Sequence, residues 1–88
     1  PGGSLYCISK FALQGFSRCL REELKSTGIK VSTIYPGATW SDSWKGVDLP
    51  EDRLMQADDV AQTIIASLKL SPSAVLEEII LRPQLGDL

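Results

Sequence analysis

The chain has 88 residues, of which 43% are hydrophobic and 23% charged, and its formal net charge is -2. This composition is typical of a folded globular protein, and no apolar run approaches the roughly 18 residues of a membrane span, so we predict no membrane partner. The small negative charge leaves no basic surface for a phosphate backbone, which argues against a nucleic-acid partner. Because the sequence lacks histidine, a Ser-His-Asp or Cys-His arrangement within the chain is excluded.

The first predicted element is a long amphipathic helix from about Leu5 to Ser26. Apolar residues recur along it at helical spacing in a wide stripe, which suggests burial against more than one neighbour. These residues are Ile8, Ala12, Phe16, Cys19 and Leu20, with Leu13 and Leu24 widening the stripe. The opposite face is expected to meet water and carries Gln14, Arg18, Arg21 and Lys25. Gly28 is placed to end the helix in a left-handed conformation.

The two cysteines, Cys7 and Cys19, lie twelve residues apart on this predicted helix. That separation corresponds to roughly 18 Å along a helix axis, which is far beyond the reach of a disulfide. We therefore expect two reduced thiols in the core, as in a cytoplasmic protein.

Tyr6 and Lys10 are four residues apart on the same helix, so their side chains lie one above the other on one face. A free phenol has a pKa of about 10, and a nearby cation favours the phenolate, so such a pair can exchange a proton near neutral pH. The spacing alone is weak evidence, because both residue types are common on helix surfaces. The surrounding sequence has to supply the specificity.

Residues 29–35 are rich in β-branched side chains and lie between Gly28 and Pro36, which predicts a buried strand. An irregular loop is expected from Gly37 to about Gln56.

A second helix follows this loop, with Asp58 and Asp59 placing negative charge on its first turn. Its apolar positions are Val60, Ala61, Ile64, Ile65 and Leu68. Ser71-Pro72-Ser73 closes this helix, residues 75–81 predict a second strand, and Arg82-Pro83 begins a short tail.

The alternation of helices and strands is typical of an α/β domain with parallel strands and right-handed crossovers. Two strands are too few for a stable parallel sheet, because such a sheet needs both faces covered and further strands at its edges. The chain is long enough to form a hydrophobic core, but its predicted architecture requires further strands. We therefore expect residues 1–88 to be a fragment of one domain, or a chain that another copy completes.

Several short runs along nearly the whole chain form a recognisable pattern. In order they are Tyr6-Cys-Ile-Ser-Lys10-Phe-Ala-Leu-Gln-Gly15-Phe16, Leu20-Arg-Glu-Glu-Leu24, Gly28-Ile-Lys-Val31, Ile34-Tyr-Pro-Gly-Ala-Thr39, Asp58-Asp-Val-Ala61 and Leu81-Arg-Pro83. Their residues, order and spacing resemble the C-terminal third of the classical short-chain dehydrogenase/reductase family. The resemblance implies the last part of a Rossmann-like, doubly wound parallel sheet, with the glycine-rich nucleotide-binding part of the family absent from the chain.

The same resemblance implies the chemistry of a parent oxidoreductase that transfers a hydride between NAD or NADP and an alcohol or carbonyl substrate. Tyr6 would be the catalytic acid/base, and Lys10 would support it and hydrogen-bond the nicotinamide ribose. The family's catalytic serine falls outside the chain, and neither Ser4 nor Ser9 takes its place.

The family's segment that borders the nicotinamide corresponds to Pro36, Gly37 and the backbone near Thr39, with the hydroxyl of Thr39 or Ser41 as a side-chain contact. Ligands of α/β sheets bind at such strand ends. Trp40 and Trp44 would belong to a flap over the substrate. They suit an apolar or aromatic substrate, or they simply anchor the flap on the core, and the sequence leaves both options open.

Acidic residues of the loop show no metal-binding spacing and are expected to form a solvated face; they are Asp42, Asp48, Glu51 and Asp52.

Two functional classes stay open: a dehydrogenase fragment that is inactive by itself, and a non-catalytic α/β assembly or interaction module. An unrelated receiver-like domain explains neither the Tyr6 and Lys10 pair nor the run from Leu81 to Pro83. The family resemblance also implies a homo-oligomer, a dimer or tetramer, because its tyrosine-bearing helix commonly packs at a subunit interface.

Overall fold

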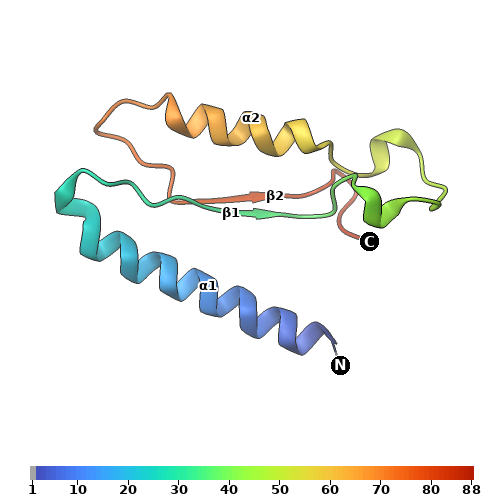
Figure 1. The fold of residues 1–88 in the computed structure, drawn as a ribbon, viewed down its shortest axis with the longest axis horizontal. Coiled ribbons are helices and arrows are strands. Elements are labelled where there is room, and N and C mark those ends of the chain that lie inside the picture. Colours follow the sequence, from blue (N-terminus) through green and yellow to red (C-terminus); the bar gives the residue numbers. More distant parts are fainter. Residues whose placement is uncertain (1) are drawn as a thin grey trace.

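The computed structural model of the protein describes residues 2–88 (Figure 1). Its helices and strands follow one another as α1 (Gly2–Leu24), β1 (Thr33–Pro36), α2 (Ala57–Leu68) and β2 (Glu78–Leu81). Short 3₁₀-helices lie between them, and these are η1 (Lys25–Thr27), η2 (Asp42–Trp44) and η3 (Glu51–Arg53). The structure therefore confirms the predicted order of helix, strand, loop, helix and strand.

The two strands pair in parallel, with Thr33 opposite Glu78 and Pro36 opposite Leu81. α1 lies on one side of this sheet and α2 on the other, so the layers are helix, sheet and helix (Figure 1). Both strands are shorter than predicted, because each finds a partner over only four residues. Pro36 is the last residue of β1 rather than the residue after it, and the next N–H, that of Gly37, donates to the Leu81 carbonyl at 2.7 Å.

The predicted end of the first helix and the predicted start of the second are confirmed by their local contacts, whereas α1 begins at Gly2 rather than at about Leu5. Gly28 follows η1 with a φ of 85°, the left-handed conformation that a glycine adopts without steric cost. At the start of α2, the carboxylate of Asp59 accepts the backbone N–H of Gln56 at 2.9 Å. Such a bond satisfies a free N–H of the first turn and places negative charge at the positive end of the helix dipole.

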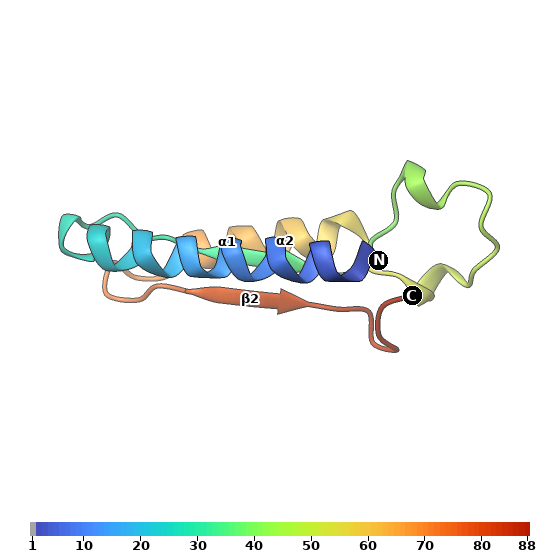
Figure 2. The ribbon, with the colours of Figure 1, turned by 90° about the horizontal axis from the view of Figure 1, so that it is seen from below.

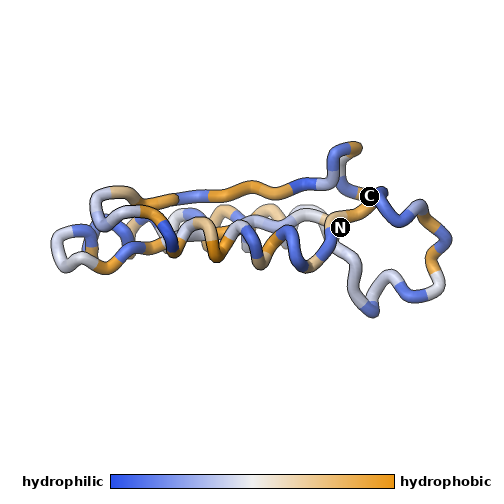
Figure 3. The backbone as a smooth tube through the Cα atoms, turned by 90° about the horizontal axis from the view of Figure 1, so that it is seen from above, coloured by the Kyte–Doolittle hydropathy of each residue, from blue (hydrophilic) through white to orange (hydrophobic). Residues whose placement is uncertain are grey.

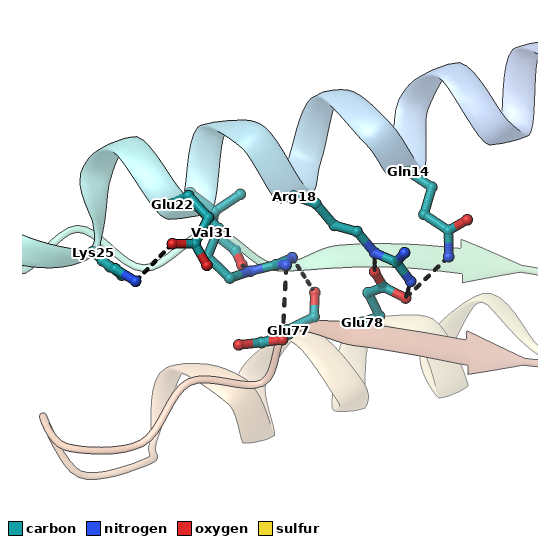
Figure 4. Close-up of polar contacts among 8 residues, drawn as sticks. Gln14, Arg18, Glu22, Lys25, Val31, Glu77 and Glu78 are labelled. Carbon is teal, nitrogen blue, oxygen red and sulfur yellow. Dashed lines mark hydrogen bonds and ion pairs between the residues drawn. The ribbon is translucent and has the colours of Figure 1, made fainter.

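Part of the polar face of α1 lies against β2. The prediction that this face meets water holds for Arg18 and Lys25, which are exposed, and is corrected for Gln14 and Arg21, which are half-buried. Gln14 and Arg18 both donate to the carboxylate of Glu78, at 3.2 and 2.8 Å (Figure 4). Arg21 donates to the backbone carbonyls of Val31 and Glu77, at 3.1 and 2.9 Å. The reason is charge: Glu77 lies just before β2 and Glu78 is its first residue, and the arginines that pair with them lie on the basic face of the helix.

Most of the apolar stripe of α1 is exposed, and only Leu20 and Leu24 are half-buried, so the predicted burial against more than one neighbour is not seen within residues 2–88. Ile8 is 65% exposed and Phe16 is 64% exposed, while Ser17 is only 5% exposed. Cys7 and Cys19 are free thiols, as predicted, but they are exposed rather than part of a core. A sheet of two strands is too narrow to cover both sides of a helix of 23 residues.

The buried apolar residues of the described part are few and lie near the carboxyl ends of the strands. Leu54 is 4% exposed and Met55 is 8% exposed. Met55 forms a parallel bridge with Thr39 just beyond β1. Hydrophobic residues elsewhere are spread along α1 and β2 (Figure 3), and neither α1 nor α2 is long and apolar enough to cross a membrane.

Candidate active site

The N-terminal part of α1, the carboxyl ends of both strands and the end of the chain gather at one end of the molecule (Figure 1). A pocket of about 230 Å³ lies there. Its lining residues are Tyr6, Lys10, Tyr35, Pro36, Gly37, Ile80, Arg82 and Asp87. Four of the residues predicted from the sequence, Tyr6, Lys10, Pro36 and Gly37, therefore line one cavity.

Tyr6 and Lys10 reach this pocket because they lie one helical turn apart in α1. The Tyr6 side chain is open to an incoming molecule, since the residue is 66% exposed. The Lys10 ammonium lies 5.6 Å from the centre of the Tyr35 ring, within cation–π range. Tyr35 was not predicted as a site residue, and its buried hydroxyl has no hydrogen-bond partner within the part of the chain that the structure describes.

The segment after β1 is held by backbone hydrogen bonds to the residues before α2. Trp40 N–H donates to the Met55 carbonyl at 2.9 Å, and Met55 N–H donates to the Ala38 carbonyl at 3.1 Å. Between them, the N–H and C=O of Thr39 take part in no hydrogen bond with residues 2–88. This backbone edge has both a donor and an acceptor to offer, which is what a carboxamide requires.

The hydroxyls of Thr39 and Ser41 are engaged locally. Thr39 donates to the Gly37 carbonyl at 2.9 Å. The Ser41 hydroxyl accepts the Ser43 N–H at 3.3 Å and so caps η2. Neither residue lines the pocket with Tyr6. The two hydroxyls that were predicted to contact the nicotinamide cofactor therefore make hydrogen bonds within the chain in this structure.

The tryptophans of the loop, Trp40 and Trp44, do not line this pocket. The indole N–H of Trp40 donates to the Glu51 carbonyl at 2.8 Å, which ties the two sides of the loop together. Trp44 is half-buried at the end of η2. The bond made by Trp40 lies within the loop, so both options for these side chains, a substrate contact and an anchor on the core, stay open.

Asp87 is another pocket residue that sequence reasoning missed, as it missed Ile80 and Arg82. Its carboxylate accepts the Ala38 N–H at 2.8 Å and pairs with Arg82 at 3.2 Å. The hydrogen bond from Ala38 lowers the pKa of Asp87 below its usual value, and the positive charge of Arg82 lowers it further. The signal available in the sequence was Pro83 followed by Gly86, a combination typical of a turn that sends the tail back on itself.

The acidic residues of the loop, Asp42, Asp48, Glu51 and Asp52, are all exposed, as predicted. No group of three Cys, Asp or Glu side chains in residues 2–88 comes close enough together to hold a metal ion.

Known proteins share this sequence pattern. The profile of the family described as short chain dehydrogenase matches residues 1–52. A sepiapterin reductase of Chlorobaculum tepidum is 33% identical over 86 residues, which are 97% of this chain and 35% of that protein. The mitochondrial D-beta-hydroxybutyrate dehydrogenase of Mus musculus is 51% identical over 37 residues, which are 42% of this chain and 11% of that protein.

Among solved structures, the chain is similar to a betaketoacyl-ACP reductase from Bacteroides thetaiotaomicron. The TM-score is 0.81 at 32% identity, over 94% of this chain and 37% of that one. The predicted α/β, Rossmann-like fold class is thereby confirmed. The chain spans little more than a third of the sepiapterin reductase and of this solved structure. With a family profile that matches more than half of its residues, the chain belongs to the short-chain dehydrogenase family.

Proposed function

We propose that this chain carries the proton-transfer half of an active site that moves a hydride between NAD or NADP and an alcohol or carbonyl substrate. The observation that carries the proposal is the shared pocket. Tyr6 and Lys10 from α1 line it together with Pro36 and Gly37 from the end of β1. Binding at the carboxyl ends of parallel strands is the general rule for α/β sheets.

Tyr6 is the acid/base in this proposal. In reduction its hydroxyl donates a proton to the carbonyl oxygen of the substrate, and in oxidation its phenolate takes the proton of the alcohol. Its exposed position at the pocket leaves room for that oxygen. Lys10 supports the phenolate electrostatically from one helical turn away.

The nicotinamide cofactor would supply or accept the hydride. The residues present fit its polar groups, because the Thr39 backbone has a free donor and acceptor within the described part of the chain. Pro36, Gly37 and Thr39 would border the nicotinamide ring, and Lys10 would hydrogen-bond its ribose hydroxyls. The hydroxyl of Thr39 or Ser41 would turn from its local bond toward the carboxamide when the cofactor binds.

The chain acts in this proposal as part of a longer domain, which we call the whole domain. The support is that relatives of the same fold are far longer than this chain. Dinucleotide affinity comes mainly from a glycine-rich turn and a helix N-terminus that hold the pyrophosphate. The 88-residue chain by itself is then inactive, and the whole domain is a homo-oligomer that acts on a small molecule in the cytoplasm.

A second candidate function is that of a non-catalytic assembly or interaction module. The exposed apolar face of α1, with Ile8, Phe11 and Phe16, favours it, because a large exposed apolar surface marks an interaction site. This candidate predicts that Tyr6 and Lys10 are dispensable.

The experiment that separates the two candidates is Tyr6→Phe in the whole domain. The ring stays but the proton is gone, so we expect turnover to fall by about 10²- to 10⁴-fold while the cofactor binds as before. Steady-state rates and a cofactor fluorescence titration measure both quantities. Cys7→Ser, a change at the neighbouring exposed position, serves as the matched control. A Tyr6→Phe variant with normal turnover across the pH range contradicts the catalytic assignment.

A further inference from the structure

The tail after β2 turns back on the strand ends through a defined turn. Gly86 N–H donates to the Pro83 carbonyl at 2.8 Å, and Gly86 has a φ of 89°, in the left-handed region. Pro83 is buried, and Arg53 donates to the Gly86 carbonyl at 2.7 Å. Figure 2 shows the tail hooking back beside the carboxyl end of β2. The contacts place Asp87 next to the segment that follows β1.

Asp87 contacts that segment at Gly37 and Ala38. One carboxylate oxygen accepts the Ala38 N–H at 2.8 Å, and the other pairs with Arg82 at 3.2 Å. A Cβ atom at position 37 would overlap the same carboxylate, so only glycine lets Asp87 approach this closely. The opposite edge of the segment is held by the bond from Met55 N–H to the Ala38 carbonyl.

We propose that Asp87 is a positioning residue for cofactor binding, which fixes the backbone of Ala38 and Thr39 so that the free donor and acceptor of Thr39 meet the nicotinamide carboxamide. The inference rests on the function proposed above. Ala38 is held by its N–H on one side and by its carbonyl on the other, and the Thr39 peptide groups follow directly in the chain. A charge-assisted hydrogen bond is stronger than a neutral one, which suits a carboxylate to this role.

The charged and titratable groups around Asp87 are Arg82 from the tail, Lys10 and Tyr6 from α1, and Tyr35 from β1. The bond from Ala38 and the charge of Arg82 keep the pKa of Asp87 below its usual value. A lowered pKa in the folded state means that the contact is present at neutral pH. It is lost only as the pH falls through that lowered value.

The test compares Asp87→Ala with Asp87→Asn in the whole domain. Alanine removes the acceptor, whereas asparagine keeps an oxygen at the same position without the charge. We expect Asp87→Ala to raise the KM for the nicotinamide cofactor by about tenfold or more, with a smaller change in kcat, as the loss of a hydrogen bond to a charged group implies. Asp87→Asn should restore part of that loss, because a neutral acceptor makes a weaker hydrogen bond than a carboxylate. Asp48→Ala, a change at an exposed aspartate of the loop, is the matched control.

A second readout follows hydrogen exchange at the Ala38 amide, which depends on no activity. Asp87→Ala should speed exchange there by about tenfold while the amides of α2 keep their protection. The proposal is overturned if cofactor KM and Ala38 exchange are both unchanged, or if α2 loses protection to the same extent, which would indicate a general structural role. If the whole domain transfers no hydride, the proposed function fails, and hydrogen exchange at the Ala38 amide still decides whether Asp87 holds the segment.

Discussion

The Lys10 ammonium lies 5.6 Å from the centre of the Tyr35 ring, so the lysine that the sequence pairs with Tyr6 also contacts the aromatic residue near the end of β1. This contact joins the helix to the strand end at the pocket. A cation over an aromatic ring is stabilised by about 0.5–1 kcal/mol at an exposed site. Tyr35 thereby restricts where the ammonium can lie relative to the proposed acid/base.

Lys10→Met removes the charge and keeps a similar aliphatic stem. We expect it to weaken cofactor binding by about tenfold or more and also to lower kcat, because both the ribose contact and the support of the phenolate are lost. Tyr6→Phe should lower kcat alone. Kinetics in the whole domain, with a fluorescence titration of the reduced cofactor, distinguish the two patterns. Normal cofactor affinity in Lys10→Met would rule out the ribose contact.

Arg21→Ala tests the polar contact between α1 and the sheet. The Arg21 side chain is only 11% exposed and bonds two backbone carbonyls, so its loss should destabilise the whole domain by about 2 kcal/mol. Lys25→Ala is the control, because its ion pair with Glu22 is exposed and contributes little to stability. Urea unfolding at neutral pH gives both values. Equal midpoints for the two variants would show that Arg21 does not hold the helix in place.

The 88-residue chain by itself should bind neither NAD nor NADP and should show no dehydrogenase activity. It would touch only the nicotinamide half of the cofactor, and a few exposed contacts cannot offset the cost of ordering a flexible dinucleotide. The fluorescence of the reduced cofactor and the emission of Trp40 and Trp44 report binding directly. Saturation at micromolar cofactor would mean that the chain forms a full site in another way.

The isolated chain should also associate with itself, because α1 exposes a row of large apolar residues and both strands have an open edge. Light scattering at several concentrations should detect dimers or larger species. Phe11→Gln should reduce the association, whereas Glu23→Gln, elsewhere on the same helix, should leave it unchanged. A monomer that unfolds cooperatively would contradict this expectation.

The elements that local signals define were predictable from the sequence. The stop at Gly28 follows from its conformational freedom, and the start of α2 follows from Asp58 and Asp59. The pairing of Tyr6 with the end of β1 came from the family resemblance. Each of these rests on residues close together in the chain or on a known pattern.

The orientation of α1 could not be predicted in the same way. Periodicity shows which face of a helix is apolar, but not what that face meets. The contacts that set the orientation of α1 join Arg18 and Gln14 to Glu78, which lies 60 and 64 positions farther along the chain. The hydrogen bond from Arg18 lowers the pKa of Glu78, with Gln14 adding to the effect, so the carboxylate is charged at neutral pH. Asp87 was missed for a similar reason, because its position depends on a turn and on a distant backbone N–H.

The length of α1 gives Arg21 an influence on the far end of the molecule. Arg21 and Tyr6 are 15 residues apart, which is about 22 Å along a rigid helix. If the helix tilts slightly about the Arg21 anchor, the phenol of Tyr6 therefore moves several times farther than the atoms near Arg21. We therefore expect Arg21→Ala to change the rate of the proposed reaction without touching the pocket, so a search for variants with altered activity should include this remote end.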